Sequence, residues 1–150
     1  MKNNSSSQRN GYPRPLNITI TLDGRTLGRS HHFFRVAYTD VEVRSNEFEA
    51  LTDIVYEILV SEYGASTLPS ILGKRNKHTT ICRLRESITN AVGDETGKRL
   101  ILHKGRTTYA INVSRWKIVI ADSFEDLSKT GHLPGEKVQK ILDAYRALHK

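Results

Sequence analysis

Basic side chains are concentrated in one part of this chain. Residues 72–115 carry ten Lys or Arg against three Asp or Glu, whereas the residues before them carry seven against eight and those after them six against five. This window therefore accounts for the whole formal excess of +7. Because charge of one sign gathered in one place binds a polyanion at a defined position, the pattern predicts a docking surface for nucleic acid.

Titratable groups do not converge on a catalytic or metal-binding pattern. The one cysteine, Cys82, excludes an intrachain disulfide and a cysteine-based metal cluster and fits a reducing compartment. His78 precedes it by four residues, a spacing that a nucleophile and its base can share on a helix, but no orienting group or oxyanion donor follows. We interpret Cys82 as a small residue at the edge of the core. The acids near Asp122 have no histidine spaced to join them, so we expect no enzyme activity, no metal and no cofactor.

The segment 77–92 predicts a helix with two different faces. At 100° per residue, apolar side chains cluster on one side, namely Ile81, Leu84, Ile88 and Val92. Arg, Thr and Asn side chains fall on the opposite side, namely Arg75, Asn76, Thr79, Arg83 and Asn90. These residue types can hydrogen-bond to base edges in a major groove, whereas Lys mainly supplies charge. An ordinary solvated face is the alternative interpretation.

A hairpin with a basic tip is expected after this helix. Two β-rich segments, 99–103 and 107–112, are joined by Lys104-Gly105-Arg106. A basic helix followed by such a hairpin is the order of a winged helix-turn-helix. In that arrangement one helix enters the major groove, and the hairpin reaches neighbouring phosphates or the minor groove.

Strands and two further helices are expected before the basic window. Residues 17–22 alternate apolar and polar up to a turn signal at Asp23-Gly24, and 31–43 suggest two more short strands broken near Thr39-Asp40. Ser45 predicts the N-cap of a helix of about 17 residues that ends near Gly64. Acids on its outer face should keep it away from a polyanion: Glu47, Asp53, Glu57 and Glu62. A short second helix is expected over 67–72.

The two ends of the chain receive separate predictions. Residues 1–16 are Asn-, Ser-, Arg- and Pro-rich and predict a disordered segment. Residues 114–150 predict a C-terminal extension with a strand near Trp116, a short helix capped by Ser123 and an amphipathic helix opened by Pro134. That helix either packs on the domain or forms a dimer contact. The apolar stretches are far shorter than the roughly 20 residues that span a bilayer, so no membrane contact is expected.

From 17 to 113 the chain resembles the OmpR/PhoB-type winged-helix effector domain. Val41–Leu51 is similar to the family's strand followed by a Thr-x-x-Glu-Phe-x-x-Leu helix start. Thr80–Arg85 with Ile88 is similar to its His-Ile-x-x-Leu-Arg-x-x-Leu recognition helix, and Leu100–Ile111 looks like its wing. The resemblance implies an α+β winged helix-turn-helix without the family's receiver domain: an N-terminal antiparallel sheet, three helices and a β-hairpin wing, here followed by the C-terminal helical extension.

The resemblance also implies roles for individual residues. Thr79 and Arg83 are the candidates for contacts at or near bases, and Arg85 for phosphate. The rest of the predicted DNA-binding set is Lys74, Arg75, Asn76, Lys77 and His78 around the start of the third helix, and Lys104 and Arg106 on the wing.

These observations predict a transcriptional regulator that binds double-stranded DNA. We expect it in the cytoplasm of a bacterium, on the nucleoid, with RNA polymerase or other transcription proteins as further partners and a homodimer as an open possibility. The alternative is a winged-helix protein-interaction module that binds an acidic partner in a larger assembly.

Overall fold

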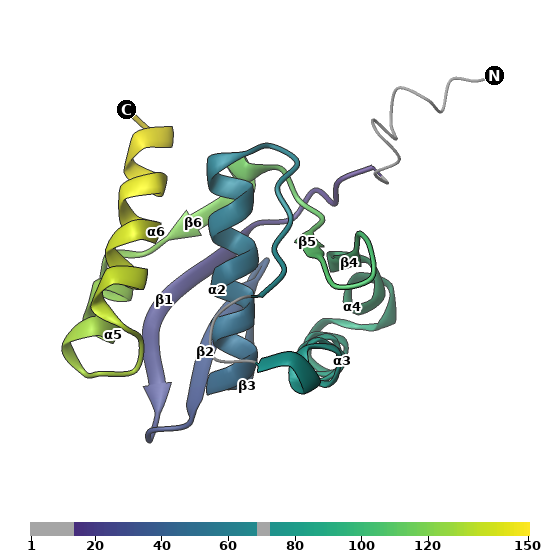
Figure 1. Cartoon of the computed structure of the whole chain (residues 1–150), viewed down its shortest axis with the longest axis horizontal. Helices are drawn as coiled ribbons and strands as arrows, with labels where there is room; N and C mark the ends of the chain where they lie inside the picture. The colour runs from purple at the N-terminus through teal and green to yellow at the C-terminus, as the bar shows by residue number, and fades with distance from the viewer. Residues whose placement is uncertain (1–13, 69–72) are drawn as a thin grey trace.

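This α+β fold is built around one sheet (Figure 1). Two helices cover one face of the sheet, and a unit made of helices and a hairpin lies beside them. The computed structural model describes residues 14–68 and 73–150, and of residues 73–76 it describes the backbone alone. The α+β class is therefore the one expected from the sequence.

The main sheet has four strands in the order β3-β2-β1-β6. β1 (Ile20–Leu27) pairs antiparallel with β2 (His31–Val36), and β2 pairs antiparallel with β3 (Thr39–Arg44). β6 (Ile118–Ile120) lies parallel to β1 at the other edge. A parallel neighbour requires a crossover, and here the chain between β3 and β6 supplies it. The two strands expected at 31–43 are confirmed, but the break predicted near Thr39-Asp40 is wrong, because both residues pair within β3 and the turn lies at Ala37-Tyr38.

The turn predicted at Asp23-Gly24 is wrong. β1 continues through both residues with an irregular register between Leu22 and Thr26, and the chain reverses after Leu27, where Gly28 has a φ of 65°. Gly24 instead allows Ser123 to approach the β1 backbone closely. Its N–H donates to Ser123 Oγ at 3.0 Å, and a Cβ at this position would collide with the Ser123 carbonyl oxygen.

α2 (Ser45–Val60) lies across the sheet and carries the centre of the core. The helix has Arg44 as its N-cap instead of the predicted Ser45, and the Arg44 N–H donates to the Glu47 carboxylate at 3.1 Å. The helix ends at Val60, before the predicted Gly64. The side chains of its apolar face are completely buried, namely Phe48, Leu51, Ile54 and Val55.

α6 (Gly135–Leu148) packs beside α2 and joins it through a buried ionic group. Lys137 Nζ lies 2.9 Å from Glu49 Oε2 and 2.6 Å from Asp53 Oδ1. Desolvation raises the pKa of Asp53, although Lys137 opposes this effect. The prediction that Glu47 and Asp53 lie on an outer face is therefore wrong, because both are buried.

The C-terminal residues belong to the same core as the N-terminal ones. η2 (Arg115–Lys117) leads into β6, and η3 (Asp122–Glu125) and α5 (Asp126–Lys129) lead to α6. Pro134 is the N-cap of α6, as predicted, while Ala121 replaces Ser123 as the cap of the short helix. Buried side chains of this region join the core cluster: Ile118, Ile120, Phe124, Leu127, Leu133, Val138, Ile141 and Leu142.

α3 (Gly73–Val92), α4 (Asp94–Leu100) and the hairpin of β4 (Ile101–His103) and β5 (Tyr109–Ile111) form the unit beside the sheet. α3 starts four residues before the predicted position, and α4 occupies part of the expected hairpin strand. The hairpin itself is confirmed, with Ile101 opposite Ile111. Gly97 permits the close contact of α4 with α3, because a Cβ there would lie 2.7 Å from Thr89 Cα.

Two predicted segments fall largely outside the described residues. Of the short helix expected over 67–72, residues 69–72 lie outside them, and Thr67 and Leu68 are not helical. Ser66 instead forms an antiparallel bridge with Tyr109. Of the segment 1–16 that was expected to be disordered, residues 1–13 lie outside, and Leu16 pairs with Val113.

Candidate nucleic-acid interface

One polar face of α3 is open to solvent. Thr79, Arg83, Glu86 and Asn90 are exposed, whereas Ile81, Leu84 and Ile88 on the opposite side are completely buried. The predicted division of this helix into a packing face and an open face is therefore confirmed. The open strip has four side chains that can hydrogen-bond at helical spacing, and one of them, Glu86, is an acid.

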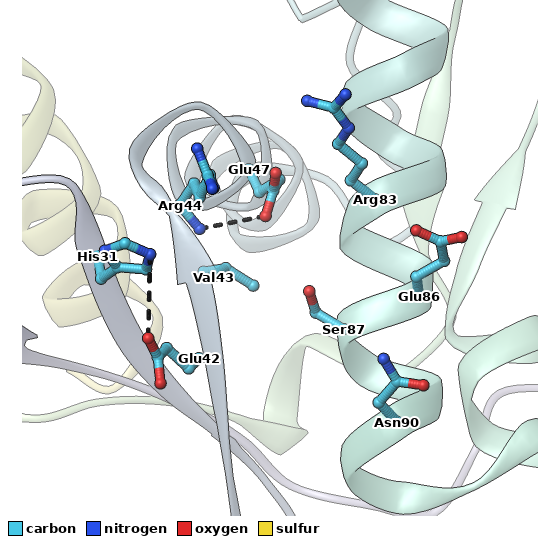
Figure 2. Close-up of a pocket in the computed structure, with 9 residues that line it drawn as sticks. All are labelled: His31, Glu42, Val43, Arg44, Glu47, Arg83, Glu86, Ser87 and Asn90. Atoms are coloured by element: carbon cyan, nitrogen blue, oxygen red, sulfur yellow. Dashed lines mark hydrogen bonds and ion pairs between the residues drawn. The ribbon is translucent and has the colours of Figure 1, made fainter.

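A groove runs between α3 and the edge of the sheet (Figure 2). Its volume is about 580 Å³, and Arg83, Glu86, Ser87 and Asn90 line its α3 side. The lining of the opposite side comes from β2, β3 and the start of α2: His31, Glu42, Val43, Arg44 and Glu47. Figure 2 shows Arg83 extending from α3 on the side where Arg44 and Glu47 lie. Each wall of the groove therefore carries both a cation and a carboxylate.

Arg83 and Arg44 are the cations of this groove that face solvent. Both residues are exposed. Within the part of the chain that the structure describes, no carboxylate lies within 4.0 Å of either guanidinium group. Each can therefore meet an anionic ligand without first breaking an ion pair.

The β4–β5 hairpin lies on the other side of α3. Its tip is closed by the Lys104 N–H, which donates to the Thr108 carbonyl at 2.8 Å. Arg106 is exposed at this tip, and Lys104 is half-buried, with its pKa lowered by desolvation. The basic tip predicted from the sequence is thus present, with Arg106 as its more accessible cation.

Arg85 occupies a different position from Arg83, although the two are only two residues apart. Its guanidinium donates from Nε and Nη2 to the Ile101 carbonyl, at 3.1 and 2.7 Å. The side chain is half-buried and joins α3 to the first strand of the hairpin. Arg85 thus has a role in positioning the hairpin that the phosphate prediction did not include.

His78 and Cys82 lie on the side of α3 that faces the hairpin. The distance from Cys82 Sγ to His78 Nε2 is 3.5 Å, and the His78 ring lies 6.4 Å from the ring of His103. His103 stacks on Tyr109 at 4.6 Å, and its Nε2 lies 3.0 Å from the Arg106 carbonyl oxygen. No group of three or more His, Cys, Asp or Glu in the described ranges is placed to hold a metal ion. His78 on the helix and His103 on the hairpin therefore lie near each other at the surface.

The remaining predicted residues are only partly placed. The side chains of Lys74, Arg75 and Asn76 lie outside the described residues, so their positions stay predictions. Lys77 is half-buried and His78 is exposed, both near the start of α3. The structure thus gathers Thr79, Arg83 and the hairpin tip around one helix.

Sequence reasoning missed Arg44 and His31 as part of this surface. Both lie outside the basic window, in a stretch whose charges nearly cancel. Only the packing of α3 beside β3 brings them to the groove. The local sequence contains no signal for that contact.

A comparison with protein-family models, with curated proteins and with solved structures finds no match for this chain. Among the described residues, no helix is both long enough and apolar enough to cross a bilayer.

Proposed function

We propose that this protein binds double-stranded DNA as a winged helix-turn-helix, with α3 in the major groove and the β4–β5 hairpin against adjacent phosphates or the minor groove. The observation that carries this proposal is the open polar strip of α3, together with a hairpin of basic tip that is bonded to the same helix through Arg85. An α-helix fits the width of a major groove, and its outward side chains then face the base edges. Transcriptional regulation on the nucleoid, contact with RNA polymerase and homodimer formation are extensions of the same proposal.

The side chains of the strip match known base contacts by their chemistry. Arg83 can donate two hydrogen bonds to guanine O6 and N7, and Asn90 can bond to adenine N6 and N7. Glu86 repels phosphates but can accept a hydrogen bond from cytosine N4. Thr79 can contact any of these edges or a thymine methyl group. A strip of this composition suits sequence readout better than charge alone does.

The flanking cations suit the phosphate backbone. Arg44 at the groove and Arg106 at the hairpin tip lie on opposite sides of α3 and are exposed. Phosphate contacts of this kind set the register of a protein on DNA without reading sequence. Arg85, through its bonds to Ile101, would hold the hairpin at a fixed position relative to the helix.

Selection of bound duplexes from a random pool, followed by mobility-shift titration, tests this function. Arg83→Ala should cost about 1–3 kcal/mol on the selected site and relax the preference at one base pair. Arg106→Ala should weaken all duplexes about equally and reduce the salt slope by about one. Lys129→Ala, a cation on α5, is the matched control and should change neither. Equal affinity of the wild type for selected and random duplexes would refute sequence readout.

A protein-interaction module is the second candidate. The acids Glu42, Glu47 and Glu86 in the groove favour it, because a peptide of mixed charge would satisfy both signs. Absence of any mobility shift at about 50 mM salt, where non-specific DNA contacts are strong, would support this candidate over DNA binding.

A further inference from the structure

An aromatic and basic surface lies on the α6 side of the molecule. We call it the C-terminal aromatic patch and define it by Arg115, Trp116, Lys117, Tyr145 and His149. The Trp116 side chain meets the His149 ring edge-on at 5.9 Å, and His149 lies 4.5 Å from the Tyr145 ring. Residues about thirty positions apart in sequence thus share one surface, on elements other than α3 and the hairpin (Figure 1).

The backbone that carries Trp116 is held in place, and its indole is open to solvent. The backbone N–H of Trp116 donates to Ser114 Oγ at 3.2 Å, which caps the turn η2, and β6 then anchors the turn to β1. Trp116 nevertheless remains 57% exposed. A tryptophan side chain has only two rotatable bonds, so it loses little conformational entropy when a flat ligand covers it.

Basic side chains lie next to the indole. The Arg115 guanidinium lies 5.5 Å from the centre of the Trp116 ring, and its Nε is buried without a hydrogen-bond partner in the described structure. Lys117 follows directly in the chain. Among the described residues, no carboxylate lies within 4.0 Å of the Arg115 or Lys117 side-chain nitrogens. The patch therefore attracts an anionic partner.

We propose that the C-terminal aromatic patch binds single-stranded nucleic acid, with one base stacked on Trp116 and the neighbouring phosphates held by Arg115 and Lys117. Single strands expose base faces that a duplex keeps stacked, and proteins bind them by combining aromatic side chains with a cationic surface. The patch contains both components. It is independent of the duplex-binding surface on α3.

Charge favours this ligand over a second copy of the chain. A symmetric contact through the patch would place Arg115 and Lys117 of two copies near each other, and like charges across an interface are unfavourable. Every base has a face that can stack on an indole, and every linkage carries a phosphate. Each nucleotide of a single strand can therefore contact both Trp116 and the cations beside it.

Trp116 is the only tryptophan of the chain, so its fluorescence reports on this patch alone. Titration of the full chain with an oligothymidylate of eight nucleotides at low salt should quench the emission in a saturable way. Binding followed by anisotropy of a labelled oligonucleotide should weaken about tenfold in Trp116→Ala, weaken in Arg115→Ala and persist in Trp116→Phe. Arg83→Ala and Lys129→Ala should leave the quenching unchanged, which separates the patch from α3.

Three results would overturn the proposal. The first is the absence of quenching in the folded wild type. The second is quenching that disappears in Arg83→Ala, which would place the ligand on α3. The third is a concentration-dependent dimer in sedimentation that Trp116→Ala abolishes, which would identify a second copy as the occupant. Circular dichroism and thermal melting of each variant establish that it is folded before binding is compared.

Discussion

His32 makes the stability of this fold depend on pH. Its ring is 1% exposed, stacks on Phe48 at 4.4 Å and has no hydrogen-bond partner for either nitrogen among the described residues. Burial, with smaller effects of His132 and His31, lowers its pKa from 6.5 to about 4, against the opposing effect of Glu49. The folded protein therefore holds this imidazole neutral.

The sign and size of the effect follow from these two pKa values. Because the folded-state pKa is the lower one, the unfolded chain takes up the proton first, and stability is lost as the pH falls from about 6.5 towards 4. A difference of one pKa unit is worth about 1.4 kcal/mol, so the full loss approaches about 3 kcal/mol. The two-state expression places about 2 kcal/mol of this loss between pH 7.5 and 5.

Removing the imidazole should remove this part of the pH dependence. His32→Phe keeps a ring against Phe48 and lacks the titrating nitrogens, and His32→Leu serves as a second variant should the larger ring strain the core. Urea unfolding at pH 7.5, 6 and 5 should give a wild-type free energy of unfolding that falls by about 2 kcal/mol more than that of either variant. His149→Gln, at an exposed histidine, is the control.

Two results would refute this reasoning. If the variants lose as much stability as the wild type between pH 7.5 and 5, His32 is not the titrating group. If the ring nitrogens of His32 titrate near 6.5 when followed by NMR in the folded protein, the imidazole is not held neutral by burial.

Three further changes test the packing around the two surfaces. The Lys137 side chain is only 13% exposed, and Lys137→Met removes this cation from two buried carboxylates of α2. The free energy of unfolding in urea should therefore fall by about 3–5 kcal/mol. Lys140→Met, at an exposed position, should lower it far less. A loss below about 1 kcal/mol would contradict the buried ion group. Gly97→Ala drives a methyl group into Thr89 and should lower stability by about 1–3 kcal/mol, and an unchanged melting temperature would show that α4 does not pack closely on α3. Arg85→Leu removes both bonds to the hairpin, so amide hydrogen exchange should accelerate in β4 and β5 while the main sheet keeps its protection, and equal protection throughout would contradict the positioning role.

Several elements of the fold could be predicted from local sequence because their signals are local. Apolar residues at helical spacing on 77–92 identified the buried and open faces of α3. Alternating apolar residues identified β2 and β3, and the Pro134 start with its apolar stripe identified α6. The apolar pattern of a helix or strand repeats every few residues, and a cap is set by the residues next to it. One segment therefore contains enough information to define both.

Other features depend on contacts between distant segments. Asp23-Gly24 has the composition of a turn, but Ser123 approaches Gly24 and keeps β1 continuous there. Asp53 was predicted to lie on a solvated face of α2, but Lys137, more than eighty residues later, binds it inside the structure together with Glu49. Local sequence does not predict such contacts, because the partner residue lies outside the segment being read.

The sequence by itself determined that positive charge is concentrated at 72–115 and that a helix and a hairpin carry it. Only the tertiary structure decided which cations remain available. Arg83 and Arg85 differ by two positions, yet one is open beside the groove and the other is bound to Ile101. Arg44 joined the surface because β3 lies beside α3. Charge is a property of composition, but its availability depends on which neighbours the fold supplies, and that is a property of packing.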